Sequence, residues 1–148
     1  MSDHKVSVFF YGSYINLRVL KEADLVPETI EVARLSGFDL DIAPRANLIP
    51  SNEKCVYGIL TRATHRELGR LYTEHAHGVL GELYLPEAVL VETLDGRLQT
   101  ALTYICWTMT PREPENDYIH RILAPARDLG FPPWYVHRIA SFLKSEAV

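Results

Sequence analysis

Hydrophobic and polar residues alternate along much of the chain in a way that predicts β-strands. Residues 5–11 form an apolar, β-prone run that ends abruptly in the turn Gly12–Ser13. Residues 29–42 alternate well enough for one or two further strands, with a bulge or turn at Ser36–Gly37. The other predicted extended segments are residues 55–61, 83–93 and 98–108, the last two joined by a hairpin turn at 94–96, whereas residues 44–54 read as a loop.

A period of three to four residues predicts helices in the other segments. Residues 16–23 indicate a short helix. Thr64 and Glu67 have the spacing of a capping box, and the helix that follows them has an apolar face. That face carries Leu68, Leu71, Tyr72 and His75. Residues 117–129 predict a third helix that contains Pro125, and Pro132–Pro133 opens a last one. The pattern predicts one α+β domain over residues 1–148.

The composition argues against some classes of function. The chain has 148 residues, of which 47% are hydrophobic and 23% charged, as in a globular domain with a proper core. A net charge of -4 and the lack of a basic cluster argue against nucleic-acid binding, and no long apolar span predicts a membrane segment. Cys55 and Cys106 lie in apolar runs and are interpreted as buried, reduced thiols of a cytoplasmic protein.

The Gly12–Ser13 turn is the first candidate for chemistry. A strand that stops in such a turn presents backbone N–H groups at its end, and glycine lets a ligand approach the main chain closely. The turn is therefore suited to bind a carboxylate or an oxyanion. We expect it to line a polar pocket, with the N–H group of Ser13 or Tyr14 directed at the ligand.

Several segments in a fixed order resemble the gamma-glutamylcyclotransferase-like (AIG2-like) superfamily. They are FFYGSYI, VARLSGFDLDI, RANLIPSNEKCVYGIL, LTRATHRELGRLY, TALTYICW and DYIHRILAPARDLGFPPWYVHRI. Together they cover nearly the whole chain. The resemblance implies a mixed, mostly antiparallel sheet that curls into a partial barrel with flanking helices.

The resemblance also implies an activity. Enzymes of this superfamily release 5-oxoproline from γ-glutamyl amines by attack of the substrate's own α-amine on its γ-carbonyl, without a cofactor. One glutamate just after the short helix acts as general acid and base, and the strand-end loop binds the substrate through its backbone. Carried over to this chain, the implied substrate-binding residues are Tyr11, Gly12, Ser13, Tyr14, Ile15, Tyr84 and Tyr104.

The sequence departs from the superfamily pattern at two positions. Tyr14 stands where an asparagine is usual. The position of the catalytic glutamate falls on His75 when counted from the helix and on His77 when counted back from Tyr84. Glu74 is one residue away, which rotates it off the apolar face. Glu82 precedes Tyr84 by two residues, so on a strand both side chains would face one cavity. The catalytic candidates are therefore Glu82, Glu74 and His75, and Glu82 is the expected replacement.

Alternative interpretations remain open at this stage. The chain is a metabolite-binding protein if it kept the pocket and lost the acid/base group. A metal-assisted hydrolase built on His75 and His77 is a further alternative, although their spacing matches no established metal site. Arg34, Arg45 and Arg62 are candidates for binding a substrate carboxylate. Exposed strands of such a small domain would also allow a homodimer.

Overall fold

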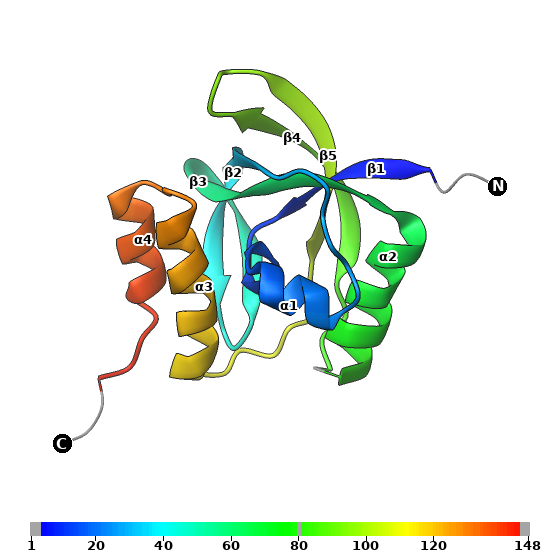
Figure 1. Cartoon of the computed structure of the whole chain (residues 1–148). Coiled ribbons are helices and arrows are strands. Elements are labelled where there is room, and N and C mark those ends of the chain that lie inside the picture. The colour runs from blue at the N-terminus through cyan, green and yellow to red at the C-terminus, as the bar shows by residue number, and fades with distance from the viewer. Residues whose placement is uncertain (1–3, 80, 146–148) are drawn as a thin grey trace.

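The computed structural model describes residues 4–79 and 81–145, with the side chains of residues 77–79 outside the description. Its centre is a single sheet that closes into a ring (Figure 1). The strands are β1 (Lys5–Phe10), β2 (Glu31–Ile42), β3 (Ala46–Thr64), β4 (Leu85–Thr93) and β5 (Leu98–Ile105).

The order of the strands around the ring is β1-β3-β2-β4-β5. All neighbouring pairs are antiparallel except β1 and β5, which run parallel at Val8 and Leu102 and close the ring. The predicted α+β class and mostly antiparallel sheet are confirmed. The ring is uneven, because β1 and β5 share one residue pair and β2 and β4 share two, which agrees with the predicted partial barrel.

Strand β3 is much longer than predicted, and the expected loop over residues 44–54 is wrong. β2 and β3 form a long hairpin in which Ile42 pairs with Ala46 and Phe38 pairs with Pro50. Alternation is lost over residues 49–54 because all of them except the half-buried Ser51 are exposed, so this polar stretch resembles a loop. The register shifts between Ser36 and Phe38, where Gly37 has a φ of 93°, so the predicted bulge is confirmed.

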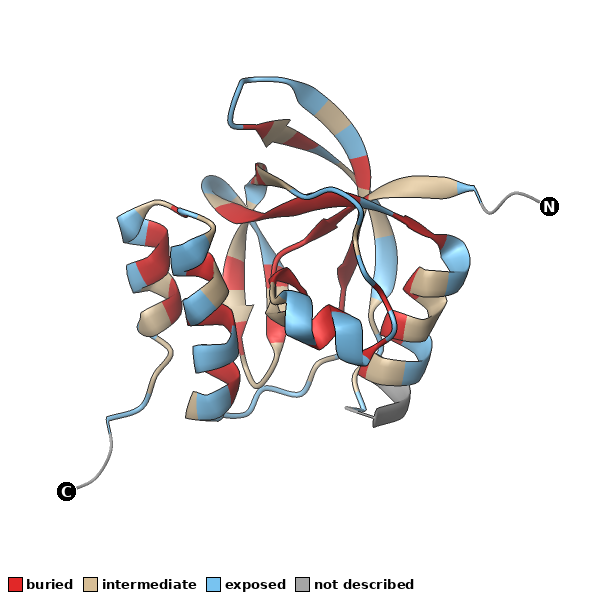
Figure 2. Ribbon diagram, in the orientation of Figure 1, coloured by how far each residue is buried: buried red, intermediate tan, exposed pale blue. Residues whose placement is uncertain are grey.

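Helices cover the flanks of the ring and bury one face each against it (Figures 1 and 2). α3 and α4 lie side by side on one flank, and α2 with its extension η2 lies on the opposite one. The capping box of Thr64 and Glu67 is present at the start of α2. No helix in the described residues is long and apolar enough to cross a membrane. The bounds are η1 (Ser13–Ile15), α1 (Leu17–Glu22), α2 (His65–Gly69), the π-helical η2 (Arg70–Val79), α3 (Asn116–Asp128) and α4 (Pro133–Ala140).

The outer edge of β4 is paired with β2 only next to the hairpin turn. Ala33 and Arg34 of β2 pair with Thr93 and Glu92 of β4, and no pairing with β2 is found along the rest of β4 within the described residues. The hairpin of β4 and β5 projects from the ring at the top of Figure 1. Association of two copies through such an exposed strand stays a prediction.

The two cysteines differ in accessibility, which makes them separable by chemical labelling. Cys106 is 2% exposed, whereas Cys55 is half-buried, so the expectation of two inaccessible thiols is wrong for Cys55. Burial raises the pKa of the Cys55 thiol, so little of it is the reactive thiolate at neutral pH. We expect slow alkylation of Cys55 in the native protein and reaction of Cys106 only after unfolding, as measured by peptide mass spectrometry. Labelling of Cys106 before Cys55 would contradict this.

Candidate functional site

The turn after β1 is held tightly against the start of β3. A Cβ atom on Gly12 would lie 2.6 Å from the Cβ of Ala46, so only glycine allows this approach. The short helix η1 follows at once, with the Ile15 N–H donating to the Gly12 carbonyl at 3.1 Å and the Asn16 N–H donating to the Ser13 carbonyl at 3.0 Å. The turn is therefore fixed in place before any ligand arrives.

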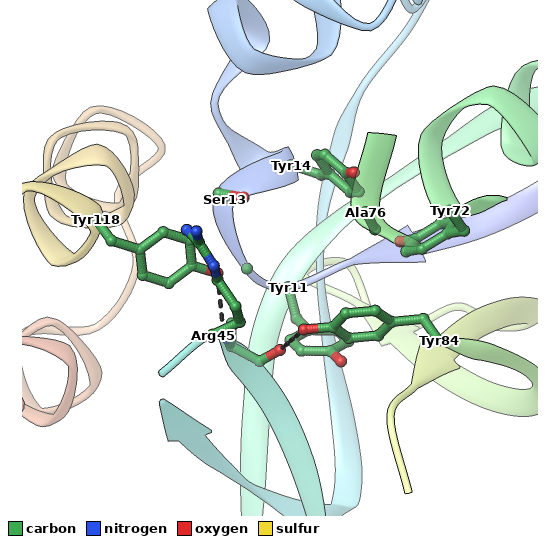
Figure 3. Close-up of a pocket in the computed structure, with 10 residues that line it drawn as sticks. Tyr11, Ser13, Tyr14, Arg45, Tyr72, Ala76, Tyr84 and Tyr118 are labelled. Atoms are coloured by element: carbon green, nitrogen blue, oxygen red, sulfur yellow. Dashed lines mark hydrogen bonds between the residues drawn. The ribbon is translucent and has the colours of Figure 1, made fainter. Parts of the chain in front are cut away.

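A small cavity opens beside this turn (Figure 3). Elements that are far apart in the sequence supply its walls: the turn, the start of β3, η2, the segment before β4, and α3. Half of the lining residues are tyrosines, and Arg45 is the charged residue among them. The lining residues are Tyr11, Gly12, Ser13, Tyr14, Arg45, Ala46, Tyr72, Ala76, Tyr84 and Tyr118.

Two of these tyrosines use their hydroxyl groups to brace the walls. The Tyr84 hydroxyl donates to the Ala46 carbonyl at 2.6 Å, and the Tyr11 hydroxyl donates to the Tyr104 carbonyl at 2.6 Å. The rings of Tyr72 and Tyr104 stack with their centroids 3.7 Å apart. Burial raises the pKa of Tyr11, Tyr72 and Tyr84, so these walls stay neutral at physiological pH.

Tyr118 of α3 reaches across to the turn and to β3. Its phenol oxygen accepts a hydrogen bond from the Ala46 N–H at 2.9 Å. Burial raises the pKa of Tyr118, and the nearby polar groups of Ala46 and Ser13 and the charge of Arg45 oppose that rise. The Arg45 guanidinium lies over the Tyr118 ring, 4.8 Å from its centroid (Figure 3).

Tyr14 connects the cavity to His75. Its hydroxyl lies 2.9 Å from His75 Nδ1 and 2.9 Å from the Leu71 carbonyl oxygen. Burial, and after it the neighbouring Tyr118, raises the pKa of Tyr14, while Arg45 opposes the rise. Tyr14 is therefore a neutral phenol at pH 7. It holds one proton that it can donate to either partner, and it can accept another hydrogen bond from the cavity.

Comparison with solved structures relates this arrangement to a known fold. No protein-family model and no curated protein matches the sequence. A structure described as a gamma-glutamyl cyclotransferase aligns with a TM-score of 0.78 at 20% identity, covering 97% of this chain and 91% of the other. An uncharacterized human protein aligns with a TM-score of 0.79 at 21% identity and the same coverage. The chain has the gamma-glutamyl cyclotransferase fold. A yeast gamma-glutamyl cyclotransferase specific to glutathione aligns at 0.64 and 11% identity, over 94% of both chains.

Within this gamma-glutamyl cyclotransferase fold, the structure does not bring Glu82 into the cavity lining. Glu82 and Tyr84 precede β4, which begins only at Leu85, so the strand alternation used to pair them does not apply. The Glu82 side chain is 12% exposed and lies 3.9 Å from an Arg112 guanidinium nitrogen. The Cys106 thiol is 3.9 Å from its other carboxylate oxygen.

The other two acid/base candidates, Glu74 and His75, differ in exposure. Glu74 is exposed on η2, whereas His75 is half-buried and directed to Tyr14. His75 itself is not part of the cavity lining, so its contact with the cavity runs through the Tyr14 hydroxyl. Among the described side chains no group of three His, Cys, Asp or Glu is placed to hold a metal ion, and the side chain of His77 lies outside the description.

Some of the predicted substrate-binding residues line the cavity and others do not. Tyr11, Gly12, Ser13, Tyr14 and Tyr84 all line the cavity. Ile15 packs into the core, and Tyr104 supports the wall from behind through its stacking on Tyr72. Their roles toward a substrate stay predictions.

Five lining residues were not among the predicted binding residues: Arg45, Ala46, Tyr72, Ala76 and Tyr118. Tyr72 and Tyr118 are typical inward-facing aromatic residues of amphipathic helices, a signal that does not distinguish a cavity wall from a core. Arg45 is one of three arginines considered for carboxylate binding. Arg34 pairs with Glu92 and Arg62 donates to the Lys5 carbonyl, so Arg45 alone of the three lies in the cavity.

Proposed function

We propose that this chain binds a γ-glutamyl amide in the cavity beside the Gly12–Ser13 turn and releases 5-oxoproline from it. The substrate's α-amine attacks its γ-carbonyl, a C–N bond forms in the ring, and the original amide C–N bond breaks. The reaction needs no oxidant or reductant. Its demands are a fixed geometry for the two reacting groups and a route for one proton from the α-amine to the leaving amine.

The observation that supports turnover is the contact between the Tyr14 hydroxyl and His75 Nδ1. Tyr14 lines the cavity and lies 2.9 Å from the imidazole. As the substrate amine attacks, its proton passes to the Tyr14 oxygen while the Tyr14 proton passes to His75. The reverse transfer delivers a proton to the departing amine. Tyr14 is the residue in contact with the substrate, and His75 acts through it.

The chemistry of the cavity also favours a nucleophilic amine. No Asp or Glu of the described residues lines the cavity, whereas Arg45 does. Burial away from any Asp or Glu side chain lowers the pKa of a bound ammonium group. The substrate amine therefore loses its proton more readily in the cavity than in water.

The same lack of a carboxylate favours a second candidate, a protein that binds a γ-glutamyl metabolite without converting it. General acid/base catalysis contributes about 10²- to 10⁴-fold to a rate, so a cavity without an effective proton acceptor binds its ligand and releases it unchanged. The two candidates differ in turnover and agree in binding.

Measurement of 5-oxoproline by mass spectrometry after incubation with a panel of γ-glutamyl amines and γ-glutamyl amino acids tests the proposal. We expect release by the wild-type protein, a loss of about 10- to 100-fold in His75→Gln, and near wild-type release in Glu82→Gln and Glu74→Gln. His120→Gln, which changes an exposed histidine of α3, is the matched control.

Each other outcome has a definite meaning. Binding of 5-oxoproline without turnover of any substrate in the panel supports the binding protein. Loss of release in Glu82→Gln with full activity in His75→Gln would return the acid/base role to Glu82 and refute the route through Tyr14.

A further inference from the structure

Arg45 is a cation that faces the cavity without a counter-charge. In the described part of the chain it makes no salt bridge with an aspartate or glutamate, whereas Arg34, Arg97 and Arg138 each pair with a carboxylate. Its guanidinium packs over the Tyr118 ring (Figure 3). A half-buried guanidinium in a cavity walled by neutral phenols has unused hydrogen-bond donors, which favours an anionic ligand.

The backbone of the turn has fewer donors to offer than its sequence suggests. The N–H groups of Ile15 and Asn16 already donate to the Gly12 and Ser13 carbonyls. The N–H of Tyr14 has no acceptor among the described residues. A carboxylate has two oxygens with about four acceptor sites, so the few free N–H groups of the turn satisfy only part of it. The remaining hydrogen bonds must come from another donor, and Arg45 is the charged donor within the cavity.

Arg45 is also held in place for this task. Arg45 directly precedes Ala46, the first residue of β3. The Ala46 N–H donates to the Tyr118 phenol oxygen, and the Ala46 carbonyl accepts from the Tyr84 hydroxyl, so the backbone beside Arg45 is fixed. Stacking on the Tyr118 ring restricts the side chain further. A guanidinium with a fixed orientation loses little freedom when it binds a carboxylate, and its planar fork matches the two carboxylate oxygens.

We propose that Arg45 determines specificity by binding a carboxylate of the ligand, so that the cavity accepts γ-glutamyl compounds with a free α-carboxylate and rejects those in which this group is a neutral amide. The identification of the ligand as a γ-glutamyl compound rests on the proposed function, whereas the preference for an anion rests on Arg45 alone. With the carboxylate at Arg45, the α-amine is left to the phenolic part of the cavity where Tyr14 lies.

Isothermal titration calorimetry with 5-oxoproline and its neutral carboxamide tests this preference without requiring turnover. We expect the wild-type protein to bind 5-oxoproline about 10- to 100-fold more tightly than the carboxamide, as one charge-assisted contact provides. Arg45→Gln should bind the two compounds with similar affinity, and Arg45→Lys should keep part of the preference. Arg121→Gln, which removes an exposed arginine of α3, should behave as wild type.

The outcomes separate this inference from the proposed function. Equal binding of the two compounds by the wild-type protein, or an unchanged preference in a folded Arg45→Gln variant, would overturn the role of Arg45 even if 5-oxoproline is released. A preference that depends on Arg45 supports the role even if no substrate is converted. Thermal unfolding of each variant shows whether it is folded. If Arg45→Gln does not fold, the preference of Arg45→Lys for 5-oxoproline over the carboxamide decides the role of Arg45.

Discussion

Tyr14→Phe should lower kcat for 5-oxoproline release by about 10²- to 10³-fold, because it removes the hydroxyl that links the cavity to His75 in the proposed route. The ring of Tyr14 packs edge-on against Phe10 and Tyr72, with centroids 5.8 and 5.4 Å away, and a phenylalanine keeps these contacts. The change should therefore act on kcat much more than on the affinity for 5-oxoproline. Steady-state kinetics and calorimetry on the same preparation measure both quantities.

Tyr135→Phe is the control for this experiment. Tyr135 is a buried tyrosine of α4 that is not part of the cavity lining, so loss of its hydroxyl should leave kcat within about twofold of wild type. Tyr14→Phe also removes a buried hydrogen bond, which costs about 1 kcal/mol of stability and has to be checked by denaturation. A folded Tyr14→Phe variant with normal kcat would show that the proton takes another path.

Gly58→Ala should lower the free energy of unfolding by more than about 3 kcal/mol, at the upper end of the effects of overpacking. A Cβ atom at Gly58 would overlap the Phe10 carbonyl oxygen and lie 2.8 Å from the Phe9 ring. The backbone of β1 would have to move, and β1 leads directly into the Gly12–Ser13 turn. Because globular domains are stable by about 5–15 kcal/mol, this is a large fraction of the total.

Urea denaturation of Gly58→Ala and Gly69→Ala provides a matched comparison. Gly69 lies at the end of α2, and no atom would come within 4 Å of a Cβ there. Alanine is the better helix former by about 0.8–1.0 kcal/mol, so Gly69→Ala should be neutral or slightly stabilising. A loss of less than about 1 kcal/mol in Gly58→Ala would mean that β1 shifts away at little cost.

Local signals in the sequence were sufficient for most of the fold. The capping box of Thr64, the bulge at Gly37 and the abrupt end of β1 each depend on neighbouring residues alone. The failure over residues 44–54 has the opposite cause. Residues 46–50 are a strand because β2 pairs with them, and some of them, such as Asn47 and Pro50, have little preference for an extended conformation.

The site was less predictable because its residues come together through tertiary contacts. The Gly12–Ser13 turn is a local feature and was found. The position of Glu82 was inferred from strand alternation, and that argument failed when β4 began three residues later, at Leu85. Tyr118 follows the turn by about a hundred positions and reaches it only through the packing of α3, which no periodicity in the sequence indicates.

The parallel contact between β1 and β5 has a consequence for the order of folding. The Thr103 hydroxyl donates to the Phe9 carbonyl across 94 positions of sequence, and Tyr118 comes later still. Closing so long a loop costs entropy before any contact repays it, and a high contact order slows folding. The contact between β1 and β5 that closes the ring therefore forms only after β5 has been synthesised. A nascent chain that stops short of α3 lacks a wall of the cavity, so ligand binding is among the last properties that the protein acquires.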